Sequence, residues 1–198
     1  MSWFRRTPIE GARWVVIDCE TSGLDAARDR LLSVGAVAVR DGVAELQDFF
    51  QARIQQAIPS ARENIVIHGI GADAQRAGRA LGEVMRGLDA FVGERLPVAF
   101  HAPFDAAVLR RHGLGTRAKW LDLAALAPAL FPQRGRDDSP LEHWLAAFGI
   151  AARARHDALG DAFTTAQLLL VALAEAKRQG VTSVEALRAA ASSRFLRP

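Results

Sequence analysis

The segment WVVIDCETSG, residues 14–23, joins a short apolar run to a polar turn. Residues 14–17 are apolar and largely β-branched, which predicts a buried strand that stops at Asp18. In extended backbone, residues two apart project to the same face, so Asp18 and Glu20 point one way while Cys19 points into the core. Two neighbouring acids repel each other, and a divalent cation bound by their hard oxygen atoms relieves that repulsion. A solvated strand end with two chance acids is the alternative, and this pair alone does not decide.

The flanking sequence predicts a sheet covered by helices. Residues 31–40 and 43–50 flank Asp41-Gly42, a two-residue hairpin signal, so the first half of the chain predicts three antiparallel strands. Two short strands, at 97–100 and 119–121, follow among segments of helical periodicity. We expect helices at residues 79–93, 104–112 (after Pro103 in a first turn), 122–130, 139–148, 158–178 and 183–191.

This order predicts an α/β fold, with a mixed five-stranded sheet (three antiparallel strands, then parallel strands) flanked by helices. No segment has the composition of a linker, so we expect one domain over residues 1–198. Within it we expect an irregular leader at 1–12, a core at 14–175 and a C-terminal appendage at 181–198.

Composition excludes several classes of protein. The chain has 198 residues, half of them hydrophobic, and a net charge of +3, with arginine as all but two of its 25 basic residues. A single cysteine excludes an intramolecular disulfide and a multi-cysteine zinc site. The first residues lack the apolar segment of a secretory signal, and the longest apolar run, 168–174, is too short to cross a bilayer. We therefore expect a cytoplasmic protein with no membrane contact.

Two later segments carry further acids at the starts of helices. Asp105 falls in the first turn of the helix after strand 97–100, where ligands commonly bind, although an acid there also complements the helix dipole. Asp157 is a good N-cap, which places His156 just before the helix and Asp161 in its first turn. Each segment alone fits an ordinary surface. Together, four carboxylates and one histidine at strand ends and helix starts predict one site.

Three segments, in order, resemble the three motifs of the DEDDh family of 3′→5′ exonucleases. They are DCETSGL at residues 18–24, FHAPFD at 100–105 and HDALGDA at 156–162. IHGI at 67–70 also resembles a segment of the proofreading epsilon subunits of DNA polymerase III, and the likeness runs from about Trp14 to Leu173. One departure is that Phe100 and His101 stand where family members often carry histidine and asparagine.

The resemblance implies a ribonuclease H-like fold and hydrolysis of phosphodiester bonds with two divalent cations, Mg²⁺ or Mn²⁺. Asp18, Glu20, Asp105 and Asp161 would hold the ions, and His156 would take a proton from the attacking water. The product would be a nucleoside 5′-monophosphate released from a 3′ end. Contacts with the terminal nucleotide are implied for Thr21, Leu24, Ile67, His68, His101 and Phe104.

The implied partner is nucleic acid with a free 3′ end, DNA in preference to RNA, with a DNA polymerase or another replication or repair protein as a further partner. Two alternatives stay open. One is an RNA-trimming exonuclease of the oligoribonuclease or ribonuclease T type. The other is a non-catalytic module that binds nucleic acid or a polymerase. The departure at His101 favours this alternative, and the five intact site residues disfavour it.

Candidate phosphate contacts are Arg110, Arg111, Arg134, Arg136, Arg153 and Arg155.

Overall fold

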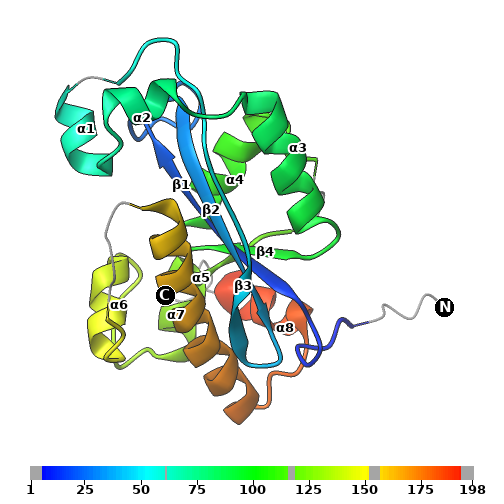
Figure 1. The fold of residues 1–198 in the computed structure, drawn as a ribbon. Coiled ribbons are helices and arrows are strands. Elements are labelled where there is room, and N and C mark those ends of the chain that lie inside the picture. Colours follow the sequence, from blue (N-terminus) through cyan, green and yellow to red (C-terminus); the bar gives the residue numbers. More distant parts are fainter. Residues whose placement is uncertain (1–5, 61, 116–118, 152–156, 193–198) are drawn as a thin grey trace.

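A single mixed sheet forms the centre of the molecule (Figure 1). The computed structural model describes residues 6–60, 62–115, 119–151 and 157–192. The strand order is β3-β2-β1-β4-β5; the first three strands are antiparallel neighbours, and β4 and β5 run parallel to β1. This arrangement confirms the predicted fold class. The strands are β1 (Trp14–Thr21), β2 (Leu31–Arg40), β3 (Val43–Arg53), β4 (Leu96–Ala99) and β5 (Leu121–Asp122).

Helices cover both faces of this sheet, and each face has its own apolar core. Along β1, Trp14 and Val16 enter the core that contains residues of α5, α6, α7 and α8, whereas Val15 and Ile17 enter the core that contains residues of α3 and α4. The helices are α1 (Arg62–His68), α2 (Ala72–Arg76), α3 (Leu81–Val92), α4 (Ala102–Arg111), α5 (Leu123–Leu130), α6 (Leu141–Ala147), α7 (Ala158–Arg178) and α8 (Val184–Ser192).

β1 is longer than the sequence predicts. The expected end at Asp18 is wrong, because the strand continues through the acids to Thr21. Asp18 pairs with Gly35 of β2 and Glu20 pairs with Ser33, and a register irregularity follows Glu20. Ladder hydrogen bonds use only backbone groups, so polar side chains at the sheet end do not stop the pairing. The acids therefore lie on the strand and are held by it.

Other boundaries differ by a few residues. β5 covers residues 121–122, whereas 119–121 was expected, and α4 begins at Ala102, one residue before Pro103, which was expected in its first turn. Residues 62–68 and 72–76 are helical, although no helix was expected there. At five to seven residues these helices are too short for a periodic pattern to stand out.

The long helix α7 is a core element. By length and composition alone it would be long and apolar enough to cross a membrane. Its residues Ala162, Ala166, Leu168 and Leu169 are fully buried in the larger core, and the helix contacts β1 and β2. Burial against a sheet explains the apolar composition of such a helix. The C-terminal helix α8 joins the same core.

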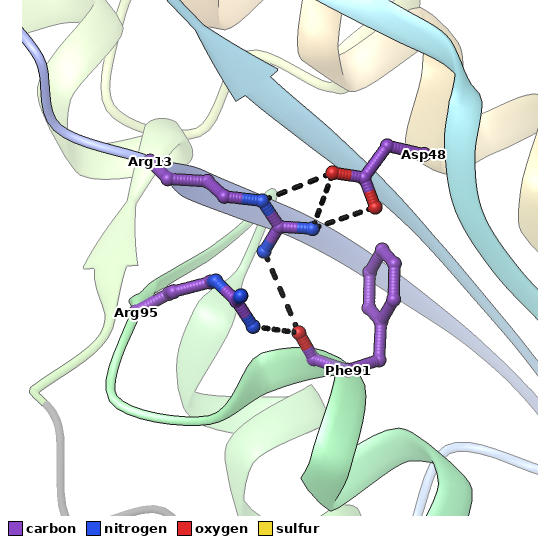
Figure 2. A network of polar contacts seen from close by, with 4 residues as sticks. All are labelled: Arg13, Asp48, Phe91 and Arg95. Carbon is purple, nitrogen blue, oxygen red and sulfur yellow. Dashed lines mark hydrogen bonds and ion pairs between the residues drawn. The ribbon is translucent and has the colours of Figure 1, made fainter.

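A polar network fixes the start of β1 (Figure 2). The guanidinium of Arg13, almost fully buried, donates to both carboxylate oxygens of Asp48 on β3, at 2.7 Å each from Nη2. It also lies over the ring of Phe91 at 5.0 Å, and the Phe91 carbonyl accepts a hydrogen bond from Arg95 at 2.8 Å. Bidentate pairing of a buried arginine restricts geometry more than a surface ion pair does. The network thus ties β1, β3 and α3 together at the end of β1 opposite the acids.

Candidate active site

β1 and α7 bring three carboxylates together. One oxygen each from Asp18, Glu20 and Asp161 lies within 4.8 Å of the other two. Asp18 and Glu20 follow Trp14 and Val16 in the alternation of β1, so they lie on the face that α7 covers. Asp161 lies in the first turn of α7. The structure therefore brings together three of the four acids that the sequence singles out.

A glycine on β2 lets α7 approach the sheet closely. Gly35 pairs with Asp18, and a Cβ atom at this position would lie 2.3 Å from the carbonyl carbon of Ala158 and from the nitrogen of Leu159. Any other residue would push the first turn of α7 away from β2. The close approach sets the distance from Asp161 to the acids of β1. The predicted site does not include Gly35, although an isolated glycine within a strand pattern is the sequence signal for such an approach.

The N-terminus of α7 is capped and braced. Asp157 is the N-cap, as predicted, and its Oδ2 accepts a hydrogen bond from the backbone N–H of Gly160 at 3.1 Å. Its other oxygen accepts from the side-chain amide of Gln51 on β3 at 3.2 Å. Gln51 also pairs with Gly35 across the ladder. The helix that carries Asp161 is therefore held both by its cap and by the neighbouring strands.

Asp105 approaches from the other face of the sheet. It lies in the first turn of α4, directly after β4, and is 5% exposed. The side chain and backbone of Cys19 lie beside its carboxylate, and their contact lowers the pKa of Asp105, against the larger effect of burial. Asp105 is not among the three acids that meet within 4.8 Å, yet its charge raises the pKa of Asp18 more than the charge of Asp161 does. Asp105 is therefore an electrostatic neighbour of the three acids and lies outside their closest group.

Burial and mutual repulsion perturb these acids. Burial raises the pKa of Asp18 well above its usual range, and the charges of Asp105 and Asp161 raise it further. Burial also raises the pKa of Glu20 to about 7, with the charge of Asp161 adding to the effect. The pKa of Asp105 rises to about 7, again through burial. A set of converging carboxylate oxygens that resist ionisation together fits a hard divalent cation, which favours their charged forms.

His101 occupies a special backbone position. Its φ of 63° and ψ of 46° place it in the left-handed region, immediately before α4. Asparagine, aspartate and histidine are the residue types other than glycine that occupy this region most readily. The replacement of asparagine by His101 therefore keeps a residue suited to the backbone. Its ring is exposed and packs edge-on against Phe100, with centroids 4.7 Å apart.

The remaining candidates fall into three groups. Thr21 and Leu24 lie where the first segment leaves β1: the Thr21 hydroxyl donates to the Gly23 carbonyl at 2.6 Å, and Leu24 is 93% exposed. Phe104 is half-buried and packs against the core of α3 and α4. Ile67 and His68 belong to α1, but their side chains are outside the described part of the structure, and the whole of His156 is outside it.

Two of the candidate phosphate-binding arginines have structural partners. The guanidinium of Arg111 donates to the carbonyls of Ala27 and Asp29, which braces the loop after β1. Arg134 donates to the Ala147 carbonyl at 2.9 Å and lies over the ring of Phe148. Arg110 and Arg136 are exposed, while Arg153 and Arg155 lie outside the described residues.

Known proteins are similar to this chain in sequence and in fold. The DNA polymerase III PolC-type protein of Thermotoga petrophila is 32% identical over 181 residues, which cover 88% of this chain and 13% of that protein. The DNA polymerase III subunit epsilon-like protein of Rhodobacter capsulatus is 30% identical over 187 residues, 91% of this chain and 26% of that protein. The chain thus spans about a quarter or less of the length of these relatives.

One solved structure has a similar fold, and one protein family matches most of the chain. The structure of exonuclease X in complex with 5′ overhanging duplex DNA superposes with a TM-score of 0.71 at 21% identity, over 90% of this chain and 99% of that chain. At this identity the likeness shows the fold. The family described as exonuclease matches residues 15–169, which include α4, the first half of α7 and all of β1 except its first residue. The chain therefore belongs to the exonuclease family, as the resemblance of its three motifs to the DEDDh exonucleases predicts.

Proposed function

We propose that this protein removes nucleoside 5′-monophosphates from the 3′ end of single-stranded DNA, with two divalent cations, Mg²⁺ or Mn²⁺, and His156 as general base. The observation that carries the proposal is the meeting of Asp18, Glu20 and Asp161 within 4.8 Å, in a chain of the exonuclease family. An ordinary fold has no reason to gather three acids on a half-buried face, because their repulsion opposes folding.

The four acids would share the binding of the cations. Asp18, Glu20 and Asp161 would supply direct oxygen ligands, while Asp105, which lies outside the closest group, would bind directly or through water. When bound, the ions supply positive charge that stabilises the scissile phosphate and the leaving 3′ oxygen. Cys19 contributes by its contact with Asp105, which favours the charged carboxylate.

The proposed base is adjacent in sequence to the N-cap of α7. His156 directly precedes Asp157 in the sequence, and Asp161 follows five residues after His156, in the first turn of α7. An unperturbed histidine titrates near pH 6.5, so its neutral form can accept a proton from water at neutral pH. The same base would then release that proton to solvent.

The substrate would present its terminal base to apolar surface beside the acids. Leu24 is the most exposed large apolar side chain described, in the loop that follows the acidic end of β1. A single strand offers that base without the cost of opening a base pair. The relatives are DNA polymerase III proteins, which favours DNA as substrate and a polymerase as a working partner. A cytoplasmic location fits such a partner.

The test is release of mononucleotides from a 3′-labelled DNA single strand, with Mg²⁺ or Mn²⁺ and with chelator as the blank. We expect release by the wild type, none by Asp18→Ala, and normal release by Glu175→Ala, which removes an acid at the far end of α7. Absence of release by the wild type with either ion contradicts the proposal. Faster digestion of a matched RNA strand reassigns the substrate to RNA, and equal activity of His156→Ala removes the proposed base.

A further inference from the structure

We propose that Asp122 is a positioning residue that holds the start of α4 and, through it, Asp105; this inference rests on the proposed function. Asp122 is the last residue of β5 and pairs with Ala99, the last residue of β4. β5 leads directly into α5, and β4 leads into α4 after two residues. Parallel pairing of the two strands therefore places the starts of both helices side by side.

One carboxylate oxygen of Asp122 serves both helices. Its Oδ1 accepts a hydrogen bond from the backbone N–H of Ala124 in α5 at 3.1 Å, and another from the N–H of Ala102 in α4 at 3.2 Å. Asp122 is thus the N-cap of its own helix and a cap supplied from a distance for α4. Asp122 lies 20 residues after Ala102 in the sequence, so no local sequence motif predicts that Asp122 caps α4.

α4 depends on this distant cap because its own N-terminus offers little. Its N-cap residue, His101, makes no side-chain hydrogen bond to the helix start within the described residues. The next residue after Ala102 is Pro103, which has no N–H to donate. The Phe104 N–H bonds to the His101 carbonyl at 3.0 Å. Of the first two residues of α4, only Ala102 has an N–H group that needs an acceptor, and Asp122 supplies that acceptor.

The position of Asp105 follows from this contact. Asp105 lies three residues after Ala102, so it moves with the first turn of α4. The carboxylate of Asp122 holds the backbone at the start of that turn, and the side chain and backbone of Cys19 lie beside the Asp105 carboxylate.

The test compares Asp122→Ala with Asp122→Asn in the full chain. Asparagine keeps a side-chain oxygen that accepts both hydrogen bonds, whereas alanine does not. We expect Asp122→Ala to lower kcat about tenfold or more on single-stranded DNA, with KM changed by less than about threefold, because displacement of a catalytic group by about 1 Å costs up to ~100-fold. Asp122→Asn should stay within about threefold of the wild type in kcat.

Ser183→Ala is the matched control for general loss of a cap. The Ser183 hydroxyl accepts from the N–H of Ala186 in the first turn of α8 at 3.2 Å, so this variant also loses a cap bond. We expect its melting temperature to fall by about 2–4 °C, as for Asp122→Ala, with kcat unchanged. An equal loss of kcat in Ser183→Ala, a normal kcat in Asp122→Ala, or a failure of Asp122→Asn to rescue overturns the proposal.

A second measurement does not depend on nuclease activity. Amide hydrogen exchange in peptides that cover residues 100–109 should be faster in Asp122→Ala than in the wild type, and asparagine should restore the wild-type rate. Unchanged exchange overturns the proposal. If the wild type releases no nucleotide, the proposed function fails, and this exchange measurement still decides whether Asp122 holds α4.

Discussion

Replacement of Gly35 by alanine tests how α7 is positioned. The new methyl carbon would lie 2.3 Å from two backbone atoms, the carbonyl carbon of Ala158 and the nitrogen of Leu159. Non-bonded carbon atoms prefer a separation of about 3.5–4.0 Å, so the shortfall is about 1.2 Å or more. Backbone atoms cannot escape by a change of rotamer. The helix start must therefore move away from β2 by about 1 Å, and Asp161 moves with it.

The cost of this displacement has two parts. Overpacking of this kind destabilises a protein by about 1–3 kcal/mol, which lowers the melting temperature of a chain of this size by roughly 2–4 °C per 1 kcal/mol. A shift of about 1 Å in one carboxylate of the proposed metal site lowers the rate by up to ~100-fold. We therefore expect a modest loss of stability together with a large loss of nuclease activity.

The assay is the initial rate of mononucleotide release from a 3′-labelled strand, beside a thermal melt. Gly82→Ala in α3 is the matched control, because a Cβ atom there meets only the end of the flexible Arg86 side chain, at 3.5 Å. That variant should keep full activity and gain about 0.5–1 kcal/mol of stability from better helix propensity. Wild-type activity and melting temperature in Gly35→Ala would refute the reasoning.

Three other perturbations test the site. Asp18→Asn removes one charge from the cluster, so the metal-free protein should melt at a higher temperature near pH ~8 but lose the rise that Mn²⁺ gives the wild type; a preserved rise contradicts the site. The raised pKa values of Glu20 and Asp105, both about 7, mean that the folded state binds more protons than the unfolded state. Protonation of these two acids therefore stabilises the fold fully below about pH 4, and this stabilisation disappears as the pH rises through about 7. The metal-free protein should require more urea to unfold near pH ~5 than near pH ~8. Equal urea midpoints at the two pH values would be inconsistent with perturbed acids. His101→Asn, which suits the left-handed backbone, should keep the rate and the melting temperature, whereas the β-branched His101→Val should lower both.

Much of the site follows from local sequence alone. Alternation along residues 14–20 places Asp18 and Glu20 on one face and Cys19 on the other, as the two cores confirm. The hairpin at Asp41-Gly42 is confirmed, with positive φ at both residues. Asp157 caps α7 as its position in the sequence predicts. These features depend on residues within one strand, turn or helix start, so their periodicity and chemistry are visible in the sequence.

Only the tertiary structure decides how these segments meet. The sequence gives no reason why α7 rests against Gly35, why Gln51 reaches Asp157, or why Asp122 caps a helix that begins 20 residues earlier. It also treats the four acids alike, while the fold puts three within 4.8 Å and brings Asp105 in from the opposite face through α4. Such distances come from strand order and from helix packing between remote segments. Propensity acts between neighbours along the chain, so it carries no information about which remote surfaces touch.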